Sequence, residues 1–152
     1  MSQPSPDSPA IIYSERLWPA WWVWTSALLV SGATVLVLIP LSTPAAIVTP
    51  IVVFGLFCWW LVSISLKIEV TADTLQVGKA RVERKFLGPA KPHLGPDATN
   101  ARGPGLDVRA FLSIRGWVRD VVEVELIDHE DPAPYWLFST REPQKLSTIL
   151  NG

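Results

Sequence analysis

Residues 18–66 read WPAWWVWTSALLVSGATVLVLIPLSTPAAIVTPIVVFGLFCWWLVSISL and contain no Asp, Glu, Lys, Arg or His. A helix on the surface of a soluble protein needs polar residues on the side that faces water. About 20 consecutive apolar residues are enough to cross the hydrocarbon of a bilayer as a helix. The stretch holds two segments of that length, about 18–39 and 45–66, and therefore predicts two transmembrane helices.

A proline-bounded turn, Pro40-Leu41-Ser42-Thr43-Pro44, separates the two segments. Proline ends a helix because it lacks a backbone N–H and restricts the residue before it. The two spans should therefore form a hairpin that enters and leaves the membrane on the same side. Pro50 either kinks the second span or marks the start of its helix.

Two other interpretations of the apolar stretch are less favoured. A secretory signal peptide needs a basic lead and a short apolar core, whereas here Asp7 and Glu15 precede the span with Arg16 as the one cation. A soluble helical hairpin needs more protein around it, and residues 67–152 are too few to enclose two such helices.

Basic residues predict the orientation, because Lys and Arg favour the cytoplasmic side of a membrane. Arg16 precedes the first span, and the turn between the spans has no cation. The cations that follow the second span are Lys67, Lys79, Arg81, Arg84 and Lys85. We therefore expect a multi-pass protein of the plasma membrane with both termini in the cytoplasm.

Tryptophans cluster where the hairpin would meet the cytoplasmic face of the membrane. Indole rings prefer the headgroup zone, which takes both their apolar body and their N–H group. The predicted interface anchors are Trp18, Trp21, Trp22, Trp24, Trp59 and Trp60. The lone cysteine, Cys58, excludes an internal disulfide. Gly32 and Gly55 each stand alone, so a homo-oligomer has no small-residue motif to support it.

The rest of the chain divides into a tail and a soluble domain. Residues 1–16 begin with a Pro- and Ser-rich run that is typical of a disordered tail. Residues 67–152 should form a cytoplasmic β-rich domain with a C-terminal helix. Alternating apolar residues at 68–70 and 75–77 predict a β-hairpin, and a third short strand is expected near 79–82.

Further strands are expected at 108–114, 122–126 and 135–138, with a weak one at 86–94. Four Gly and four Pro in residues 88–105 predict a large loop there. Leu146, Ile149 and Leu150 lie on one face of a short helix, with Pro143 in its first turn and Thr140 or Glu142 as its cap.

The expected fold class is a membrane α-helical hairpin joined to a small α+β domain that is mostly antiparallel β. The preferred specific hypothesis is a pleckstrin-homology-like roll, in which a final helix plugs one end of a bent sheet. The sequence pattern alone supports only the broader class.

Charge is uneven along the soluble domain. Residues 67–119 hold ten Lys and Arg against five Asp and Glu, and residues 120–152 hold two against seven. A basic surface near the bilayer is attracted to anionic headgroups. The alternative is that the two halves neutralise each other after folding, because charge blocks in a sequence need not become patches in space.

Catalytic and metal-binding signatures do not stand out. His93 and His129 lack the spacing of a metal site, and Asp128-His129-Glu130-Asp131 is typical of an acidic turn. We find no nucleophile elbow, phosphate loop or zinc motif. The net charge of −1 argues against nucleic-acid binding. We therefore expect no catalytic residue, no metal and no cofactor.

Several polar and aromatic residues are candidates for contact with a partner. Arginines pair with carboxylates and with lipid phosphates. The candidates are Arg102, Arg109, Arg115, Trp117, Arg119, Asp131, Tyr135, Trp136 and Arg141. For Tyr135 and Trp136, which follow two prolines, the favoured alternative is a role in the core and at a strand end.

Five stretches together carry a resemblance to a known family. They are YSERL at 13–17, LQVGKA at 75–80, GPGLDVRAF at 103–111, DPAPYW at 131–136 and STREP at 139–143. With them, the chain from Tyr13 to Leu150 resembles a family of small actinobacterial two-span membrane proteins described as a domain of unknown function. The family pattern usually has proline where Val108 and Gly116 stand here.

The resemblance implies a two-span membrane protein and brings no activity or catalytic residue. We therefore expect a membrane-anchored, non-enzymatic interaction module, or an accessory subunit of a membrane complex. Its partners would be the lipid bilayer and a membrane or cytoplasmic protein. Binding of anionic lipid headgroups by the soluble domain is the second hypothesis, and an enzyme of unknown type is the third.

Overall fold

The computed structural model describes residues 9–152, which divide into two compact units. The hairpin unit is Trp18–Ser65. The soluble unit combines the segment that ends at Leu17 with Leu66–Gly152. The predicted N-terminal tail lies outside the described residues over positions 1–8.

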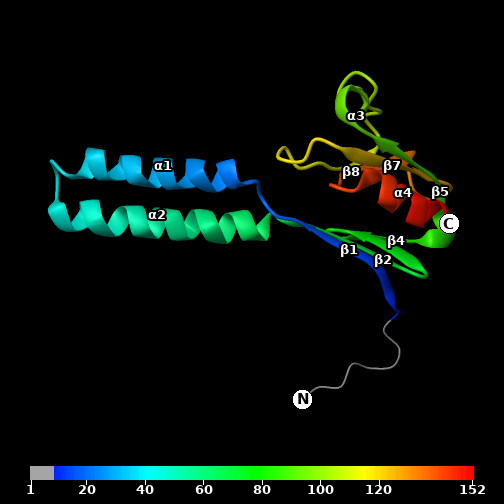
Figure 1. Ribbon diagram of the computed structural model, residues 1–152, viewed down its shortest axis with the longest axis horizontal. Helices are drawn as coiled ribbons and strands as arrows, with labels where there is room; N and C mark the ends of the chain where they lie inside the picture. Colours follow the sequence, from blue (N-terminus) through cyan, green and yellow to red (C-terminus); the bar gives the residue numbers. More distant parts are fainter. Residues whose placement is uncertain (1–8) are drawn as a thin grey trace, which may run out of the picture. The chain divides into compact units, whose positions relative to one another are not determined.

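The hairpin unit consists of two antiparallel helices, α1 (Trp21–Leu38) and α2 (Thr43–Ser63), which lie side by side (Figure 1). Their 18 and 21 residues give lengths of about 27 and 31 Å, which match the roughly 30 Å of bilayer hydrocarbon. In each span 11% of the residues are buried, whereas a core helix of a soluble protein is mostly buried. Both helices are long and apolar enough to cross a membrane.

The helices differ from the predicted spans at their ends. Thr43 and Pro44, expected in the turn, belong to the first turn of α2, because proline is well accommodated where its missing N–H has no helical partner. Pro50 lies inside α2 rather than at its start. Small side chains form much of the contact between the helices and permit a close approach. The buried residues are Ala27, Ser31, Ala46 and Leu61.

The first sheet, sheet A, has the strand order β1-β2-β3-β4 and is antiparallel throughout. Its strands are β1 (Ile11–Leu17), β2 (Leu66–Thr71), β3 (Thr74–Val77) and β4 (Ala80–Glu83). The predicted β2–β3 hairpin is confirmed. The disordered tail predicted for residues 1–16 is wrong from residue 11, because Tyr13 and Leu17 are buried in the core and fix β1 beside β2.

The pairing of β1 with β2 makes the helical hairpin an insertion between two neighbouring strands. Leu17 lies opposite Leu66 in the strand register. The sequence predicts the membrane region at residues 17–66, but Leu17 and Leu66 at its two ends belong to sheet A instead. The soluble unit is therefore discontinuous in sequence.

The second sheet, sheet B, has the strand order β5-β7-β8-β6. Its strands are β5 (Leu87–His93), β7 (Val121–Leu126), β8 (Tyr135–Ser139) and β6 (Phe111–Ser113), and β6 runs parallel to β8. A short 3₁₀ turn, η1 (Arg84–Phe86), precedes β5. Prolines 89 and 92 fit β5 because it is an edge strand.

The predicted loop at 88–105 is wrong over most of its length. It contains β5 and a helix, α3 (Gly95–Arg102), whose Ala98 and Ala101 are buried against sheet B. Proline near the start of α3 suits the first turn of a helix. The strand predicted at 108–114 shortens to β6, since the chain turns between Gly103 and Ala110.

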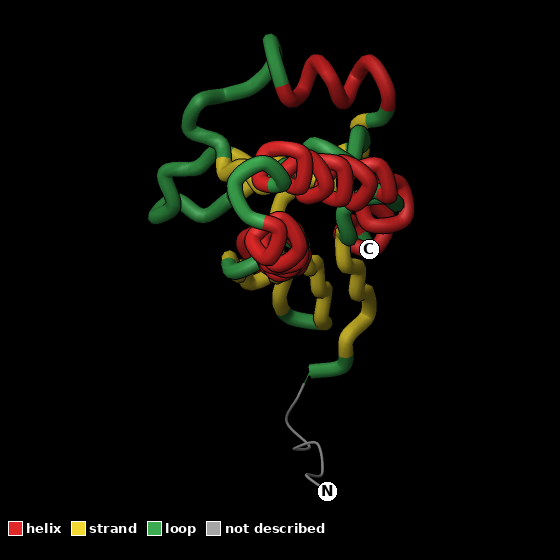
Figure 2. The backbone as a smooth tube through the Cα atoms, turned by 90° about the vertical axis from the view of Figure 1, so that its left-hand side faces the viewer, coloured by secondary structure: helices red, strands yellow, loops and turns green. Residues whose placement is uncertain are grey.

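One hydrophobic core joins sheet A, sheet B and the C-terminal helix α4 (Pro143–Asn151). The predicted helix is confirmed, and Leu146 and Leu150 lie in this core. The opposite face of sheet B is covered by α3, which Figures 1 and 2 both place outside the sheet. The soluble unit is thus an α+β domain with two small, mostly antiparallel sheets.

Polar contacts hold α4 at both of its ends. The Glu142 backbone N–H donates to Thr140 Oγ1 at 3.2 Å. At the other end, Arg84 donates to the carbonyl of Ile149 at 2.7 Å, where a cation also complements the helix dipole. The Asn151 amide exchanges two hydrogen bonds with the backbone of Ala90, and so covers part of the free edge of β5.

Candidate functional site

The loop between α3 and β6, residues 103–110, is built from backbone hydrogen bonds. The Gly105 N–H donates to the carbonyl of Asn100 at 2.9 Å, and Leu106 donates to Gly103 at 3.1 Å. The Asp107 N–H then donates to the phenol oxygen of Tyr135 at 2.8 Å. Tyr135, the first residue of β8, therefore fixes this loop to the strand.

Asp107 and Arg109 clamp the tip of the same loop. The Asp107 carboxylate accepts from the Arg109 backbone N–H at 2.9 Å and from its guanidinium at 3.1 and 3.3 Å. These hydrogen bonds, the guanidinium first, lower the pKa of Asp107. Val108 lies between the two clamped residues and is 95% exposed. These hydrogen bonds order the loop, and the apolar side chain of Val108 is exposed to solvent on it.

Trp136 lies in the core rather than on the surface. It is 5% exposed, and its ring packs on Phe111 with 4.6 Å between the ring centroids. Phe111 is in β6 and Trp136 is opposite it in β8. The two stretches 103–111 and 131–136, which carried the family resemblance, therefore meet in the fold.

Glu15 organises a second polar cluster, which sequence reasoning did not predict. Its carboxylate accepts from Tyr13 OH at 2.9 Å, from Thr140 Oγ1 at 2.6 Å and from the Arg141 backbone N–H at 2.9 Å. Tyr13 OH also lies 3.2 Å from a carboxylate oxygen of Glu142. We call these five residues the Glu15 cluster.

The Glu15 cluster joins β1 to the loop between β8 and α4. Thr140 is fully buried and Tyr13 is 6% exposed. Burial, followed by the hydrogen bond and the charge of Glu15, raises the pKa of Tyr13 above its ordinary value. The only signal in the sequence was that the stretches 13–17 and 139–143 both carried the family resemblance.

The remaining interaction candidates are spread over the soluble unit. The Arg102 guanidinium donates within α3 to Ala98, and Arg119 is exposed in the loop before β7. Asp131 accepts from the Ala133 N–H in the turn between β7 and β8, as an acidic turn would. The structure does not gather these residues into one site with Arg109.

Arg115 and Trp117 lie together in the segment between β6 and β7. Burial lowers the pKa of Arg115, whose backbone N–H donates to Ser139 Oγ at 2.8 Å. Trp117 packs against the main core. Within residues 9–152, its Nε1 atom is buried without a hydrogen-bond partner.

His93 lies between two carboxylates. Its Nδ1 atom is 2.6 Å from Asp97 Oδ2 in α3, and its Nε2 atom is 3.2 Å from Glu123 Oε2 in β7. Lys91 faces Glu123 in the strand register, so the basic and acidic halves of the sequence meet here. The described residues contain no group of three or more His, Cys, Asp and Glu side chains arranged to hold a metal ion.

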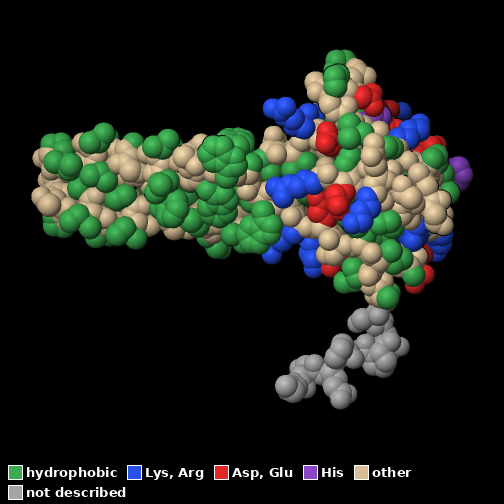
Figure 3. Space-filling view, viewed as in Figure 1, with side chains coloured by type: hydrophobic (Ala, Val, Ile, Leu, Met, Phe, Trp, Pro, Cys, Tyr) green, Lys and Arg blue, Asp and Glu red, His purple; other side chains and the backbone are tan. Residues whose placement is uncertain are grey.

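The predicted membrane anchors are largely exposed on the hairpin unit. The exposed fractions are 44% for Trp18, 78% for Trp21, 52% for Trp22, 71% for Trp59 and 50% for Trp60. Trp24 is half-buried. Figure 3 shows hydrophobic side chains along the hairpin, and the charged side chains lie on the soluble unit.

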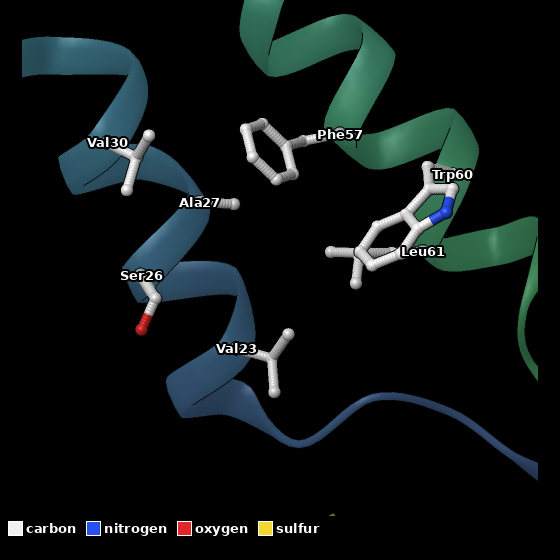
Figure 4. Close-up of a pocket in the computed structure, with 7 residues that line it drawn as sticks. All are labelled: Val23, Ser26, Ala27, Val30, Phe57, Trp60 and Leu61. Carbon is white, nitrogen blue, oxygen red and sulfur yellow. The ribbon is translucent and has the colours of Figure 1, made fainter. Parts of the chain in front are cut away.

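A small groove of about 140 Å³ lies between α1 and α2. Phe57 and Trp60 extend from α2 toward α1 above it, with their rings edge to face at 6.4 Å (Figure 4). Ser26, the one polar side chain in its lining, donates to the carbonyl of Trp22. The groove therefore presents a mostly apolar wall.

Comparison with known proteins gives a family but no relative of known activity. No curated protein and no solved structure matches the chain. A family model described as "Protein of unknown function (DUF3093)" matches residues 12–150, from β1 to α4. The chain therefore belongs to the DUF3093 family, whose members are proteins of unknown function.

Proposed function

We propose that this protein is a membrane-anchored, non-enzymatic interaction module that serves as an accessory subunit of a larger membrane complex. The hairpin anchors it, and the soluble unit makes the contact. The observation that carries the proposal is the clamped loop 103–110, which holds Val108 almost fully exposed. Confinement to a membrane raises the local concentration of partners, so one small contact surface is sufficient.

The proposed location is the plasma membrane of an actinobacterium, with both termini in the cytoplasm. Exposed apolar residues along α1 and α2 support insertion into lipid. The absence of Lys and Arg between positions 18 and 66 and the cations that flank this stretch support the orientation. The insertion of the hairpin between the neighbouring strands β1 and β2 supports an arrangement in which both of its ends leave the membrane on one side.

For the soluble unit we propose a pleckstrin-homology-like roll. The four-stranded meander of sheet A, a second sheet and a final helix packed into the shared core support this proposal. The parallel pairing of β6 with β8 departs from an all-antiparallel arrangement. The segment 103–114 supplies β6 and also the candidate contact loop.

The contact loop has features that favour a protein partner. Its backbone is held by Tyr135 and its tip by the Asp107–Arg109 pair, so little flexibility is lost on binding. It offers one apolar side chain, Val108, beside a guanidinium that is able to bind a carboxylate of the partner. Arginine is one of the residue types enriched at the energetic centre of interfaces.

The test is photo-crosslinking in native membranes with a photoreactive residue at position 108. The matched control carries the same residue at position 127, because Ile127 is 52% exposed on the same unit. We expect one specific protein adduct from position 108 and none from position 127. The substitution Val108→Glu should also abolish co-purification of that protein. Equal adducts from both positions, or co-purification that survives V108E, would contradict the proposal.

A further inference from the structure

A small pocket lies on the face of sheet A that points away from the hydrophobic core. Ile68, Val70 and Leu75 lie in the core, so the residues that alternate with them in β2 and β3 face the other way. Sheet B and α4 pack on the core side of sheet A (Figure 1). The pocket has a volume of about 170 Å³ and is lined by residues of all four strands of sheet A and by Pro9. Pockets for drug-sized ligands start at roughly 300 Å³, so a ligand of this pocket would be small.

Two threonines give the pocket a polar lining that is held in place. Thr71 and Thr74 flank the β2–β3 turn, and their hydroxyl oxygens are 2.8 Å apart. The Thr74 N–H donates to Thr71 Oγ1 at 3.1 Å, which fixes this hydroxyl further. Thr71 is 7% exposed although it faces away from the core, and Ile11, opposite it in β1, lines the same pocket. A ligand would therefore meet ordered hydroxyl groups that are partly shielded from water.

Arg81 places a cation at one side of the pocket. Its guanidinium donates to Thr74 Oγ1 through a long hydrogen bond of 3.5 Å. Among the residues that the structure describes, it forms no ion pair with a carboxylate. A guanidinium binds a carboxylate through two parallel hydrogen bonds. Arg81 is therefore able to bind a carboxylate of a ligand without giving up an ion pair.

Glu69 places an acceptor in the middle of the pocket. Glu69 on β2 lies opposite Gln76 on β3, which in turn lies opposite Arg81 on β4, so the three residues form one row across the sheet. Lys67 Nζ contacts one oxygen of the Glu69 carboxylate, Oε1, at 2.8 Å. Among the residues that the structure describes, the other oxygen is left to accept a hydrogen bond from a ligand.

The groups that line the pocket follow a fixed order across the strands. The guanidinium of Arg81 comes from β4, the carboxylate of Glu69 from β2, and an apolar wall from Ile11 of β1 and Pro9 just before it. An apolar α-amino acid carries the complementary groups in the same order, which are a carboxylate, an ammonium and an apolar side chain. This match distinguishes an amino acid from a simple anion, which would be repelled by Glu69.

We propose that this pocket binds a free apolar α-amino acid such as leucine. Its carboxylate pairs with Arg81, its ammonium donates to Glu69, and its side chain packs on Ile11. The pocket belongs to sheet A, whereas the contact loop 103–110 leads into sheet B. The amino acid site is therefore separate from the proposed protein contact.

The test measures the binding of radiolabelled L-leucine to the full chain in a neutral detergent, with unlabelled competitors. The competitor 4-methylpentanoate lacks the ammonium group, 3-methylbutylamine lacks the carboxylate, and glycine lacks the apolar side chain. Wild type should bind leucine about tenfold more tightly than each competitor, because a charge-assisted hydrogen bond and a buried aliphatic side chain each contribute about that factor or more.

Two single substitutions assign the two charged groups. Arg81→Gln should weaken leucine binding about tenfold and leave the binding of 3-methylbutylamine unchanged. Glu69→Gln should weaken leucine binding by a similar factor without weakening the binding of 4-methylpentanoate. The competitor that each variant still binds shows that its pocket is folded. The matched controls, Lys91→Gln and Glu130→Gln, make the same charge changes at exposed positions outside sheet A and should bind leucine as wild type does.

Three results would overturn the proposal. Absence of saturable leucine binding would mean that the pocket takes no amino acid. Equal weakening in the pocket variants and in their controls would mean a diffuse effect of charge. A competitor that binds as tightly as leucine would mean that the pocket recognises a different ligand. None of these results depends on the loop 103–110, so they leave the crosslinking test at position 108 unaffected.

Discussion

Leu17 and Leu66 face each other across β1 and β2, the last and first residues of their strands, with the whole helical hairpin between them in sequence. Their exposed fractions are 0% and 2%. The chain therefore leaves sheet A and returns to it at neighbouring positions of the same core.

The first prediction is that this pair contributes strongly to the stability of the soluble unit. Leu66→Ala should lower the free energy of unfolding by about 3 kcal/mol, since it removes a buried side chain and leaves a cavity. Hydrogen exchange of β7 amides in the full chain, held in detergent, measures the change. The control, Leu41→Ala, alters a hairpin residue that is 74% exposed and should leave β7 exchange unchanged. Equal effects from the two variants would contradict the prediction.

The second prediction concerns the Glu15 cluster. Glu15→Ala should lower the free energy of unfolding by about 2–4 kcal/mol, because the buried Thr140 hydroxyl and the Arg141 N–H lose this acceptor and the Tyr13 hydroxyl keeps only the Glu142 carboxylate. The matched control is Glu83→Ala on β4, whose exposed pair with Lys85 should contribute less than about 1 kcal/mol. A similar loss in both variants would show that Glu15 is an ordinary surface carboxylate.

The third prediction is a pH dependence that comes from Tyr13. Burial and the hydrogen bond to Glu15 raise the pKa of Tyr13 in the folded protein, whereas an unfolded tyrosine ionises near pH 10. The folded state then binds more protons above about pH 10, so stability is fully present below that pH and falls as pH rises through the folded pKa. Tyr13→Phe should remove this fall.

Unfolding midpoints of wild type and Y13F between about pH 8 and pH 11 test this, because that range spans the pKa of an unfolded tyrosine. The two proteins share every other titrating group, so the difference between their curves isolates Tyr13. Above about pH 10, the unfolding midpoint of wild type should fall more steeply with pH than the midpoint of Y13F. Parallel curves throughout would rule out a contribution from Tyr13.

The sequence predicted the parts of the fold that depend on local pattern. The charge-free stretch indicated the two helices, and the alternation around Ala72-Asp73-Thr74 indicated the β2–β3 hairpin. The strand β1 was missed although Tyr13, Glu15 and Leu17 alternate with exposed residues. Its neighbour β2 follows only after the hairpin, and a short strand beside a Pro-rich tail gives little signal by itself.

The sequence did not predict the Glu15 cluster, because its residues are far apart along the chain. Glu15 and Thr140 are 125 positions apart, and the contact between them depends on the way both sheets fold around one core. Periodicity reports which face of an element is buried, but not which distant element covers it. For the same reason, the nine interaction candidates were found by residue type, while the fold distributes them between the core, the turns and the loop 103–110.

The last prediction is that His93 holds α3 against sheet B. Its two ring nitrogens contact Asp97 at the start of α3 and Glu123 in β7. His93→Ala removes this bridge and leaves the two carboxylates facing each other without a partner between them. The amides of α3 should then exchange about tenfold faster, which corresponds to about 1.4 kcal/mol of local opening. The amides of β7 should keep their protection, because the main core is unchanged.

The matched control is His129→Ala, which removes the other histidine from an exposed position between β7 and β8. Its α3 amides should exchange as in wild type. If α3 exchange is also unchanged in H93A, the packing of Ala98 and Ala101 on sheet B is enough to hold the helix, and the bridge has no structural role. If β7 loses protection together with α3, the helix and the core unfold as one unit, and His93 contributes to the whole domain rather than to α3.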